Sequence, residues 1–246
     1  MCEGGEARAG GVAVSLREAR PWRPTPLPAG WSDGLAGGLE ALGREANPPA
    51  EGMGGIIPEL IGPPILRRGE ACLAPTDEST PLRRLAWPAA RILDAWLAGA
   101  LRGEAGPSPK EAENLIGLGP GLTPSGDDFI GGMLIALRAL GEEGTADRLA
   151  GWALPLAARR TGKISLAHLA CAAGGEGNAA LHGALAALAS PGAEGLAEAL
   201  AAVHAVGHTS GWDALAGAVA ACAAWTRGAA RRGRPRGFEG RRPAPV

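Results

Sequence analysis

The segment GLGPGLTPSGDDF, residues 117–129, lies between two stretches with helical spacing and sets how these helices connect. Its first ten residues include four glycines and two prolines, which together impose an unusual backbone path. The segment then opens a helix, with Ser125 as the expected N-cap and Asp128 three residues later. Free N–H groups at a helix start attract anions, and the Thr123 hydroxyl adds a further donor. A P-loop is excluded because its Lys is missing.

Two adjacent carboxylates, Asp127 and Asp128, follow this loop. An acid in the first turn is favoured by the helix dipole, so an ordinary capping box accounts for Asp128. It accounts neither for Asp127 nor for the length and rigidity of the loop. Because two carboxylates would repel a bound anion, they suit a role in holding a cation, orienting a substrate N–H or binding Arg.

A second segment, VGHTSGWD at residues 206–213, repeats this arrangement between two further helices. Each helix start has a Ser, an acid in the first turn and a Gly one turn later. The two copies are Ser125-Gly126-x-Asp128-x-x-x-Gly132 and Ser210-Gly211-x-Asp213-x-x-x-Gly217. Since such a Gly lets another backbone approach closely, we expect a pseudo-symmetric helix pair with both N-termini on one side and one shared site. Chance similarity in an Ala- and Gly-rich chain is the alternative.

His208 lies in the second loop and is the expected acid/base group, because a loop His flanked by hydroxyls is better placed for proton transfer than a helical one. His168 and His204 fall in helical stretches, where packing or surface positions are expected, and His182 is intermediate. Two roles are open for the basic cluster at residues 159–163. Its positive charges either stabilise a helix C-terminus by interacting with the negative end of the helix dipole, or they bind a carboxylate or phosphate of the substrate.

The hydrophobic period predicts an α+β fold in three parts. Residues 1–84 are expected to be β-rich, with a half-buried strand at Val12, Val14 and Leu16 followed by proline and glycine clusters. Residues 85–228 are expected to form an Ala-rich helical bundle that carries both motif loops, because the apolar spacing becomes helical near Leu85. Expected helices cover residues 127–140, 145–158, 164–173, 177–189, 194–206 and 211–227, with one more ending at Gly117 after a capping box at Ser108.

Charge and cysteine content narrow the class of protein. Residues 229–246 carry six Arg and one Glu, a charge of +5 within a total of −1, and their Pro and Gly content predicts a disordered tail. The rest of the chain is acidic, which argues against a nucleic-acid partner. The four cysteines include no CxxC pair, and no stretch resembles a signal peptide or a membrane span, so a cytoplasmic location is expected.

Several of these stretches resemble the AllH-like family, which is associated with oxamate carbamoyltransferase. The matching stretches are GLGPGLTPSGDDF at 117–129, RTGKIS at 160–165, GHTSGWDAL at 207–215 and, more weakly, VAVSLREARPWRP at 12–24. The family usually carries further β-rich sequence before the strand at 12–16, and it often has a hydroxyl residue where Gly162 stands.

The resemblance implies a subunit that works with other carbamoyltransferase subunits in allantoin and purine degradation. Oxalurate and phosphate would become oxamate and carbamoyl phosphate, so the site must hold two anions together and stabilise charge on a carbonyl oxygen. The expected catalytic residues are His208, Asp127 and Asp128. The expected substrate-binding residues are Gly119, Gly121, Thr123, Ser125, Gly126, Arg160, Thr161, Lys163, Thr209 and Ser210.

Two other functions remain open at this point. One is a hydrolase or lyase in which Asp127, Asp128 and His208 hold a divalent metal that acts on a small anionic substrate. The other is a non-catalytic anion-binding subunit whose motifs serve assembly with partners. The residues alone do not decide between these functions, because a shared scaffold does not specify one chemistry.

Overall fold

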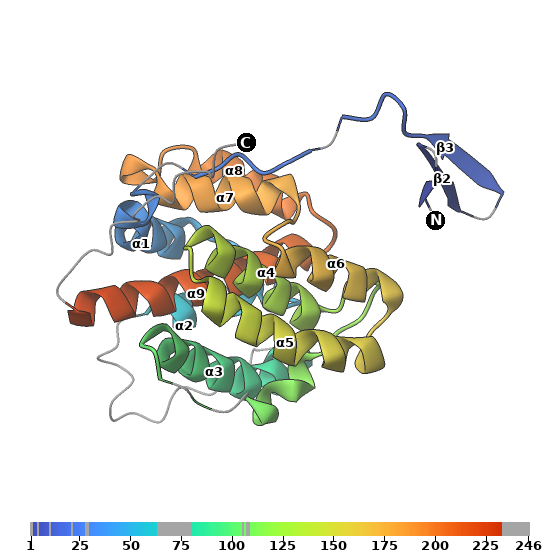
Figure 1. Ribbon diagram of the computed structural model, residues 1–246. Helices are drawn as coiled ribbons and strands as arrows, with labels where there is room; N and C mark the ends of the chain where they lie inside the picture. Colours follow the sequence, from blue (N-terminus) through green and yellow to red (C-terminus); the bar gives the residue numbers. More distant parts are fainter. Residues whose placement is uncertain are drawn as a thin grey trace, which may run out of the picture.

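The computed structural model describes residues 2–3, 5–9, 11–20, 22–27, 30–62, 80–104, 106 and 109–232. Most of these residues are helical, and helices from both halves of the chain form one body (Figure 1). The α-helices are α1 (Leu35–Glu45), α2 (Ile57–Ile61), α3 (Pro81–Leu101), α4 (Ser125–Ala139), α5 (Glu143–Arg160), α6 (Lys163–Ala173), α7 (Ala179–Ala189), α8 (Leu196–His204) and α9 (Ser210–Arg232). Short 3₁₀ helices are η1 (Trp31–Gly34), η2 (Gly54–Ile56), η4 (Lys110–Leu115) and η5 (Pro191–Ala193).

The predicted β-rich part, residues 1–84, is wrong beyond its first strands. Three short antiparallel strands, β1 (Cys2–Glu3), β2 (Glu6–Ala9) and β3 (Val12–Ser15), form a sheet in that order, with Ala7 paired to Val14. In Figure 1 this sheet lies apart from the helical body. The predicted half-buried strand is therefore exposed, with Val12 at 64% and Val14 at 52% of full exposure.

Residues 31–45 and 54–61 form helices instead of strands and loops because helical spacing buries their large apolar side chains. Leu35, Leu39 and Leu42 recur every three or four residues on α1 and are all buried. The glycines that suggested a loop serve packing here. A Cβ atom at Gly38 would lie 1.9 Å from the carbonyl oxygen of Leu188, so Gly38 lets α1 approach α7 closely. Burial of an apolar face thus outweighed the weak helix propensity of these glycines.

From residue 81 onward the predicted helical bundle is confirmed, with helix bounds close to those expected. The helix expected to end at Gly117 is the short 3₁₀ helix η4, and its predicted capping Ser108 lies outside the described residues. Helix α9 continues through residues 229–232, where the disordered tail was expected to begin, because Ala and Arg favour helix. Residues 233–246 of that tail lie outside the described residues. Across the described ranges, no helix is both long and apolar enough to cross a membrane.

Helices α4 and α9 form the centre of the body. In Figure 1, α9 passes through the middle with α4 against it, while α1, α7 and α8 lie to one side and α3 and α5 to the other. The side chains of α9 are buried almost without interruption from Gly211 to Trp225, and Phe129, Met133 and Leu134 of α4 are fully buried. A helix that is apolar on every side is the expected central element of such a body.

The α4–α9 contact is reciprocal and is made possible by glycine. A Cβ atom at Gly132 would lie 1.8 Å from the carbonyl oxygen of Ala214, and one at Gly217 would lie 1.7 Å from that of Phe129. Phe129 and Ala214 each follow the acid of their own motif, so the two contacts are equivalent. The pseudo-symmetric helix pair expected from the sequence is therefore confirmed.

Replacing either glycine by alanine should force the central helices apart. We expect Gly132→Ala and Gly217→Ala each to lower the free energy of unfolding by roughly 1–3 kcal/mol, as overpacking does. Urea denaturation measures this change. Gly151→Ala is the matched control, because Gly151 lies exposed on α5 with nothing within 4 Å of a new Cβ atom. That control should stabilise the protein by about 0.5–1 kcal/mol, and equal effects at all three positions would contradict the close crossing.

Candidate functional site

The loop at residues 117–124 takes the unusual path that its composition predicts. Gly117, Gly119 and Gly121 all have positive φ angles, which side chains disfavour. Gly117 also lies against the end of α5, since a Cβ atom there would be 2.6 Å from the carbonyl oxygen of Arg160. The N–H of Gly126 donates to the carbonyl of Leu118 at 2.9 Å, which closes the loop at the start of α4.

Asp127 holds this loop in place. Its side chain is buried at 1% exposure, and both of its oxygens accept hydrogen bonds from the protein. Oδ1 accepts from the N–H of Gly117 at 2.8 Å, and Oδ2 accepts from the hydroxyl of Ser165 at 2.7 Å. Asp127 therefore ties the loop, α4 and α6 together through a hydrogen bond at each oxygen.

The serine at the start of each central helix has its hydroxyl beside the acid of the other helix. Ser125 and Ser210 are the first helical residues of α4 and α9, and Ser125 does not cap α4, so the predicted N-cap is wrong. The hydroxyls of Ser210 and Thr123 lie beside the Asp128 carboxylate, while those of Ser125 and Thr209 lie beside Asp213. The reason is the close crossing, which brings each acid next to the start of the other helix.

The two motif loops also meet directly, because the hydroxyls of Thr123 and Ser210 lie 3.0 Å apart and share a hydrogen bond. The two loops therefore lie side by side, as the sequence predicts, while their role as one binding site stays a prediction. Asp128 and Asp213, the two acids near this contact, differ in their partners, because main-chain N–H groups donate to Asp213. Oδ1 of Asp213 accepts from the N–H of Met53, and the N–H of Gly54 also faces this carboxylate.

Burial dominates the electrostatics of these two acids. Desolvation raises the pKa of Asp128 to about 7, while the Ser210 and Thr123 hydroxyls lower it and the charges of Asp213 and Asp127 raise it further. Desolvation also raises the pKa of Asp213, against the hydrogen bonds that it accepts. Within the described part of the chain, Oδ2 of each acid is buried without a hydrogen bond of normal geometry.

A pocket of about 580 Å³ opens beside Asp128, along α4 and α6. Its polar end is formed by the starts of α4, α6 and α9, where positive helix-dipole ends converge. Apolar side chains form the walls, and the start of α7 forms the far end. The lining includes Trp22, Thr123, Asp127, Asp128, Ile135, Ser165, His168, Leu169, Glu176, Asn178, Leu181, Gly207 and Ser210.

Four of the predicted site residues, Thr123, Asp127, Asp128 and Ser210, line this pocket. His208 does not, and its expected place beside the carboxylates is wrong. Its side chain is 82% exposed, and Nε2 lies 4.0 Å from Oε2 of Glu51. The reason is that the loop before α9 turns at Gly207, which has a positive φ angle, and the next side chain then points to solvent.

The remaining predicted residues surround the pocket without lining it: Gly119, Gly121, Ser125, Gly126, Arg160, Thr161, Lys163 and Thr209. Arg160 is engaged elsewhere, because its guanidinium donates to the carbonyl of Glu113 at 2.8 Å and to Oε2 of Glu113 at 3.1 Å. Lys163 is exposed at the first position of α6. Among the described residues, no Arg or Lys side chain lines the pocket, so the predicted clamp is not formed there.

Sequence reasoning missed several lining residues, above all Ser165, His168 and Asn178. Ser165 ends the RTGKIS stretch, so its place in that motif was an available signal. Asn178 caps α7 by accepting from the N–H of Leu181 at 2.8 Å, and this role is typical of Asn. His168 was expected to be a packing or surface residue, and only the approach of α6 to α4 brings it to the pocket.

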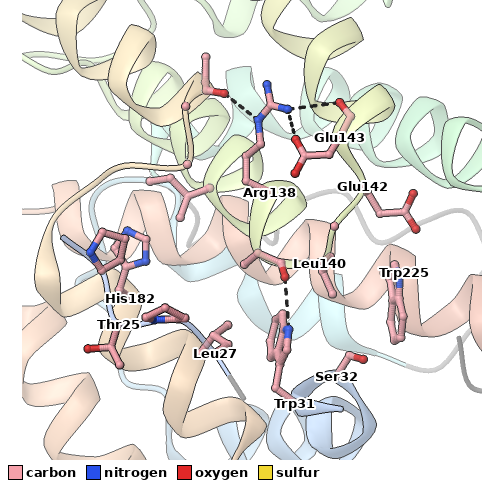
Figure 2. Close-up of a pocket in the computed structure, with 18 of the residues that line it drawn as sticks. Thr25, Leu27, Trp31, Ser32, Arg138, Leu140, Glu142, Glu143, His182 and Trp225 are labelled. Atoms are coloured by element: carbon pink, nitrogen blue, oxygen red, sulfur yellow. Dashed lines mark hydrogen bonds and ion pairs between the residues drawn. The ribbon is translucent and has the colours of Figure 1, made fainter. Parts of the chain in front are cut away.

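A second, larger pocket of about 920 Å³ lies at the other end of α4 and contains none of the predicted site residues (Figure 2). There the indole N–H of Trp31 donates to the carbonyl of Ala139 at 3.2 Å. Arg138 donates to the carbonyl of Ala173 and pairs with Glu143 and Asp147. Trp31 and Arg138 are thus satisfied by the protein itself, whereas Nε2 of His182 is buried without a hydrogen bond in the described chain. The smaller pocket is taken as the candidate site because residues of both motif loops line it.

No group of three or more His, Cys, Asp or Glu side chains suited to a metal ion occurs in the described part of the chain. The expected set was Asp127, Asp128 and His208. The two oxygens of Asp127 are occupied, and the His208 side chain is turned to solvent. These residues do not fit a divalent metal.

If Asp127 positions the loop, then Asp127→Asn should destabilise the fold. Its amide group would face the Gly117 N–H or the Ser165 hydroxyl with a nitrogen that cannot accept, at a cost of about 1–3 kcal/mol in the free energy of unfolding. Denaturant titration measures the loss. Asp147→Asn is the control, because Asp147 pairs with Arg138 at the surface and should cost less than about 1 kcal/mol. A loss no larger than that of the control would show that Asp127 does not hold the loop.

The raised pKa of Asp128 predicts a pH-dependent stability. Between about pH 3.9, the unfolded value, and pH 7, the folded protein keeps a proton that the unfolded chain has released. Wild-type stability should therefore fall relative to that of Asp128→Asn as the pH rises from about 4 to 7, and the difference should level off above pH 7. Urea titrations across this range measure the difference in free energy of unfolding between the two proteins. A difference that does not change with pH would show that the pKa of Asp128 is not raised in the folded protein.

Comparison with known proteins identifies a family that the chain resembles. The family model described as oxamate carbamoyltransferase subunit AllH matches residues 115–222, a range that contains both motif loops and every helix from α4 to α8. The weaker resemblance at residues 12–24 lies outside the matched range. Neither the curated proteins nor the solved structures gave a match. Over residues 115–222, the chain is thus confirmed to be similar to the AllH family of oxamate carbamoyltransferase subunits.

Proposed function

We propose that this protein is a subunit of an oxamate carbamoyltransferase-like enzyme in allantoin and purine degradation. The reaction converts oxalurate and phosphate into oxamate and carbamoyl phosphate. The observation that carries this proposal is the coincidence of the family match with the meeting of the two loops, where Thr123 and Ser210 share a hydrogen bond at the pocket. The free thiols of Cys171 and Cys222 suit the cytoplasm as the place of this reaction.

The substrates are anions, and the polar end of the pocket offers them backbone and hydroxyl donors. Within the described chain, the N–H groups of Thr123 and of its neighbours Gly121 and Leu122 donate to no protein acceptor, and of these three residues Thr123 lines the pocket. Together with the Thr123 hydroxyl and the starts of α4, α6 and α9, they form a suitable environment for phosphate and for a developing oxyanion. The pocket volume of about 580 Å³ is ample for two small anions held side by side.

In the proposed reaction, a phosphate oxygen attacks the carbamoyl carbon of oxalurate. The bond between this carbon and the internal nitrogen breaks, and that nitrogen takes up a proton to become the amide of oxamate. The proton comes from the attacking phosphate. We assign its transfer to Asp128, which lines the pocket and has a pKa of about 7, in place of the exposed His208.

Partner subunits belong to this proposal. The pocket is lined by Asp127, Asp128 and Glu176; Glu176 pairs with Arg23, and no described Arg or Lys side chain lines the pocket itself. A site for two anions needs more positive charge than helix starts supply. We propose that other carbamoyltransferase subunits contribute this charge at the pocket mouth.

The test is the formation of carbamoyl phosphate from oxalurate and phosphate, measured with the chain alone and with its partner subunits. Activity should require the complex. Thr123→Ala should reduce kcat/KM by roughly tenfold, since one charge-assisted hydrogen bond contributes about 1.5–3 kcal/mol. Ser125→Ala is the matched control, because its hydroxyl faces Asp213 and not the pocket, and it should reduce stability more than activity.

Two outcomes would contradict the proposal. A complete complex that forms no carbamoyl phosphate would exclude this reaction and favour a non-catalytic binding role. A Thr123→Ala complex as active as the wild type would remove the first loop from the site.

A further inference from the structure

The two motif acids occupy equivalent places in the α4–α9 pair. Each lies in the first turn of its helix, and each faces the first serine of the opposite helix and a neighbouring threonine. The main chain repeats the equivalence, since the N–H of Asp128 donates to the carbonyl of Pro124 and that of Asp213 donates to the carbonyl of Thr209. The surroundings of one acid are therefore a guide to what the other can bind.

The half-site at Asp213 is occupied by the protein itself. The segment at residues 51–54 lies against it, with Oδ1 accepting from the N–H of Met53 and the N–H of Gly54 directed at the same carboxylate. A Cβ atom at Gly52 would lie 2.5 Å from Oδ1 of Asp213, and one at Gly54 would lie 2.7 Å from Cβ of Trp212. Only a chain without side chains at these positions can bring its N–H groups this close.

The half-site at Asp128 has no such segment and opens into the pocket. Oδ2 of Asp128, like Oδ2 of Asp213, is buried without a hydrogen bond of normal geometry in the described chain, although the hydroxyls of Ser210 and Thr123 lie beside the Asp128 carboxylate. A buried acceptor without a partner is costly, and the cost is removed when a ligand supplies a donor. The occupied half-site shows that a pair of amide N–H groups is a donor that fits this arrangement.

We propose that Asp128 is the group that recognises an amide or ureido N–H of the ligand, in the way that Asp213 accepts the N–H groups of Met53 and Gly54. This inference deepens the proposed function, because it assigns one end of the ligand to one residue. A carboxylate repels an anionic group and attracts an N–H donor. Asp128 therefore orients the ligand with its N–H end inward and its anionic end toward the free loop N–H groups.

Recognition of this kind is strongest with the ionised form of Asp128, because a protonated carboxyl is neutral and has only one oxygen that accepts without also carrying a donor. The titratable groups that face the same space are Asp127 on α4, Asp213 on α9, His168 and Cys171 on α6, and Glu176 in the α6–α7 connection. Binding of an N–H donor should strengthen as Asp128 loses its proton.

The test uses malonamide, a neutral diamide, as the probe and the full-length chain without partners. Calorimetric or NMR titration at pH 8 should show malonamide binding that weakens about tenfold in Asp128→Asn, the equivalent of about 1.4 kcal/mol. Asp213→Asn is the matched control, since its half-site is filled by the protein, and it should keep malonamide affinity. Malonate, which has the same size but no N–H, should bind more weakly than malonamide to the wild type.

A second measurement does not depend on any variant folding. Malonamide affinity of the wild type should be several-fold lower at pH 5.5 than at pH 8. Unchanged affinity in a folded Asp128→Asn protein, or equal affinity at the two pH values, would overturn the inference. Amide binding through Asp128 in a protein whose complex forms no carbamoyl phosphate would refute the proposed reaction while leaving this inference intact.

Discussion

The close crossing of α4 and α9 is the contact on which the rest of this structure depends. At Gly132 and Gly217 each helix lies against a carbonyl oxygen of the other, at distances that leave no room for a Cβ atom. The first glycines of the motifs allow close contacts with the element that precedes each helix, because Gly126 lies against the carbonyl of Leu115 in η4 and Gly211 against that of Val203 in α8. The contacts at Gly132 and Gly217 bring the two helix starts together, so that polar groups distant in the sequence lie side by side.

That arrangement has an electrostatic cost, which explains the composition of the motifs. Asp128 and Asp213 are buried near each other, and burial raises the pKa of both. Hydroxyls exchanged between the helices and positive dipole ends offset part of this cost. The symmetry is broken by the segment at residues 51–54, which fills one half-site and leaves the other open to the pocket. The proposed function depends on this asymmetry, because only the open acid is available to a ligand.

The basic residues near the site have a supporting role. Arg160 binds Glu113, and its carbonyl lies against Gly117 at the beginning of the first loop. With Asp127 bound to the Gly117 N–H and to Ser165, these contacts hold the loop at both ends. Within the described chain, the pocket thus has a rigid rim and no Arg or Lys side chain in its lining, while Arg23 pairs with the lining residue Glu176.

The sequence by itself determined the helical body after residue 81, the two motif loops and the pairing of the helices that follow them. These features depend on local signals: helical periodicity, glycine and proline spacing, and a pattern repeated in one chain. The tertiary structure alone decided which side chains reach the pocket. Residues 31–45 and 54–61 became helical because their apolar side chains could be buried. The Ser125 hydroxyl faces the opposite helix, and the His208 side chain points to solvent, while Ser165 and His168 line the pocket. Each outcome depends on contacts between segments far apart in the chain, and local propensity carries no information about such contacts.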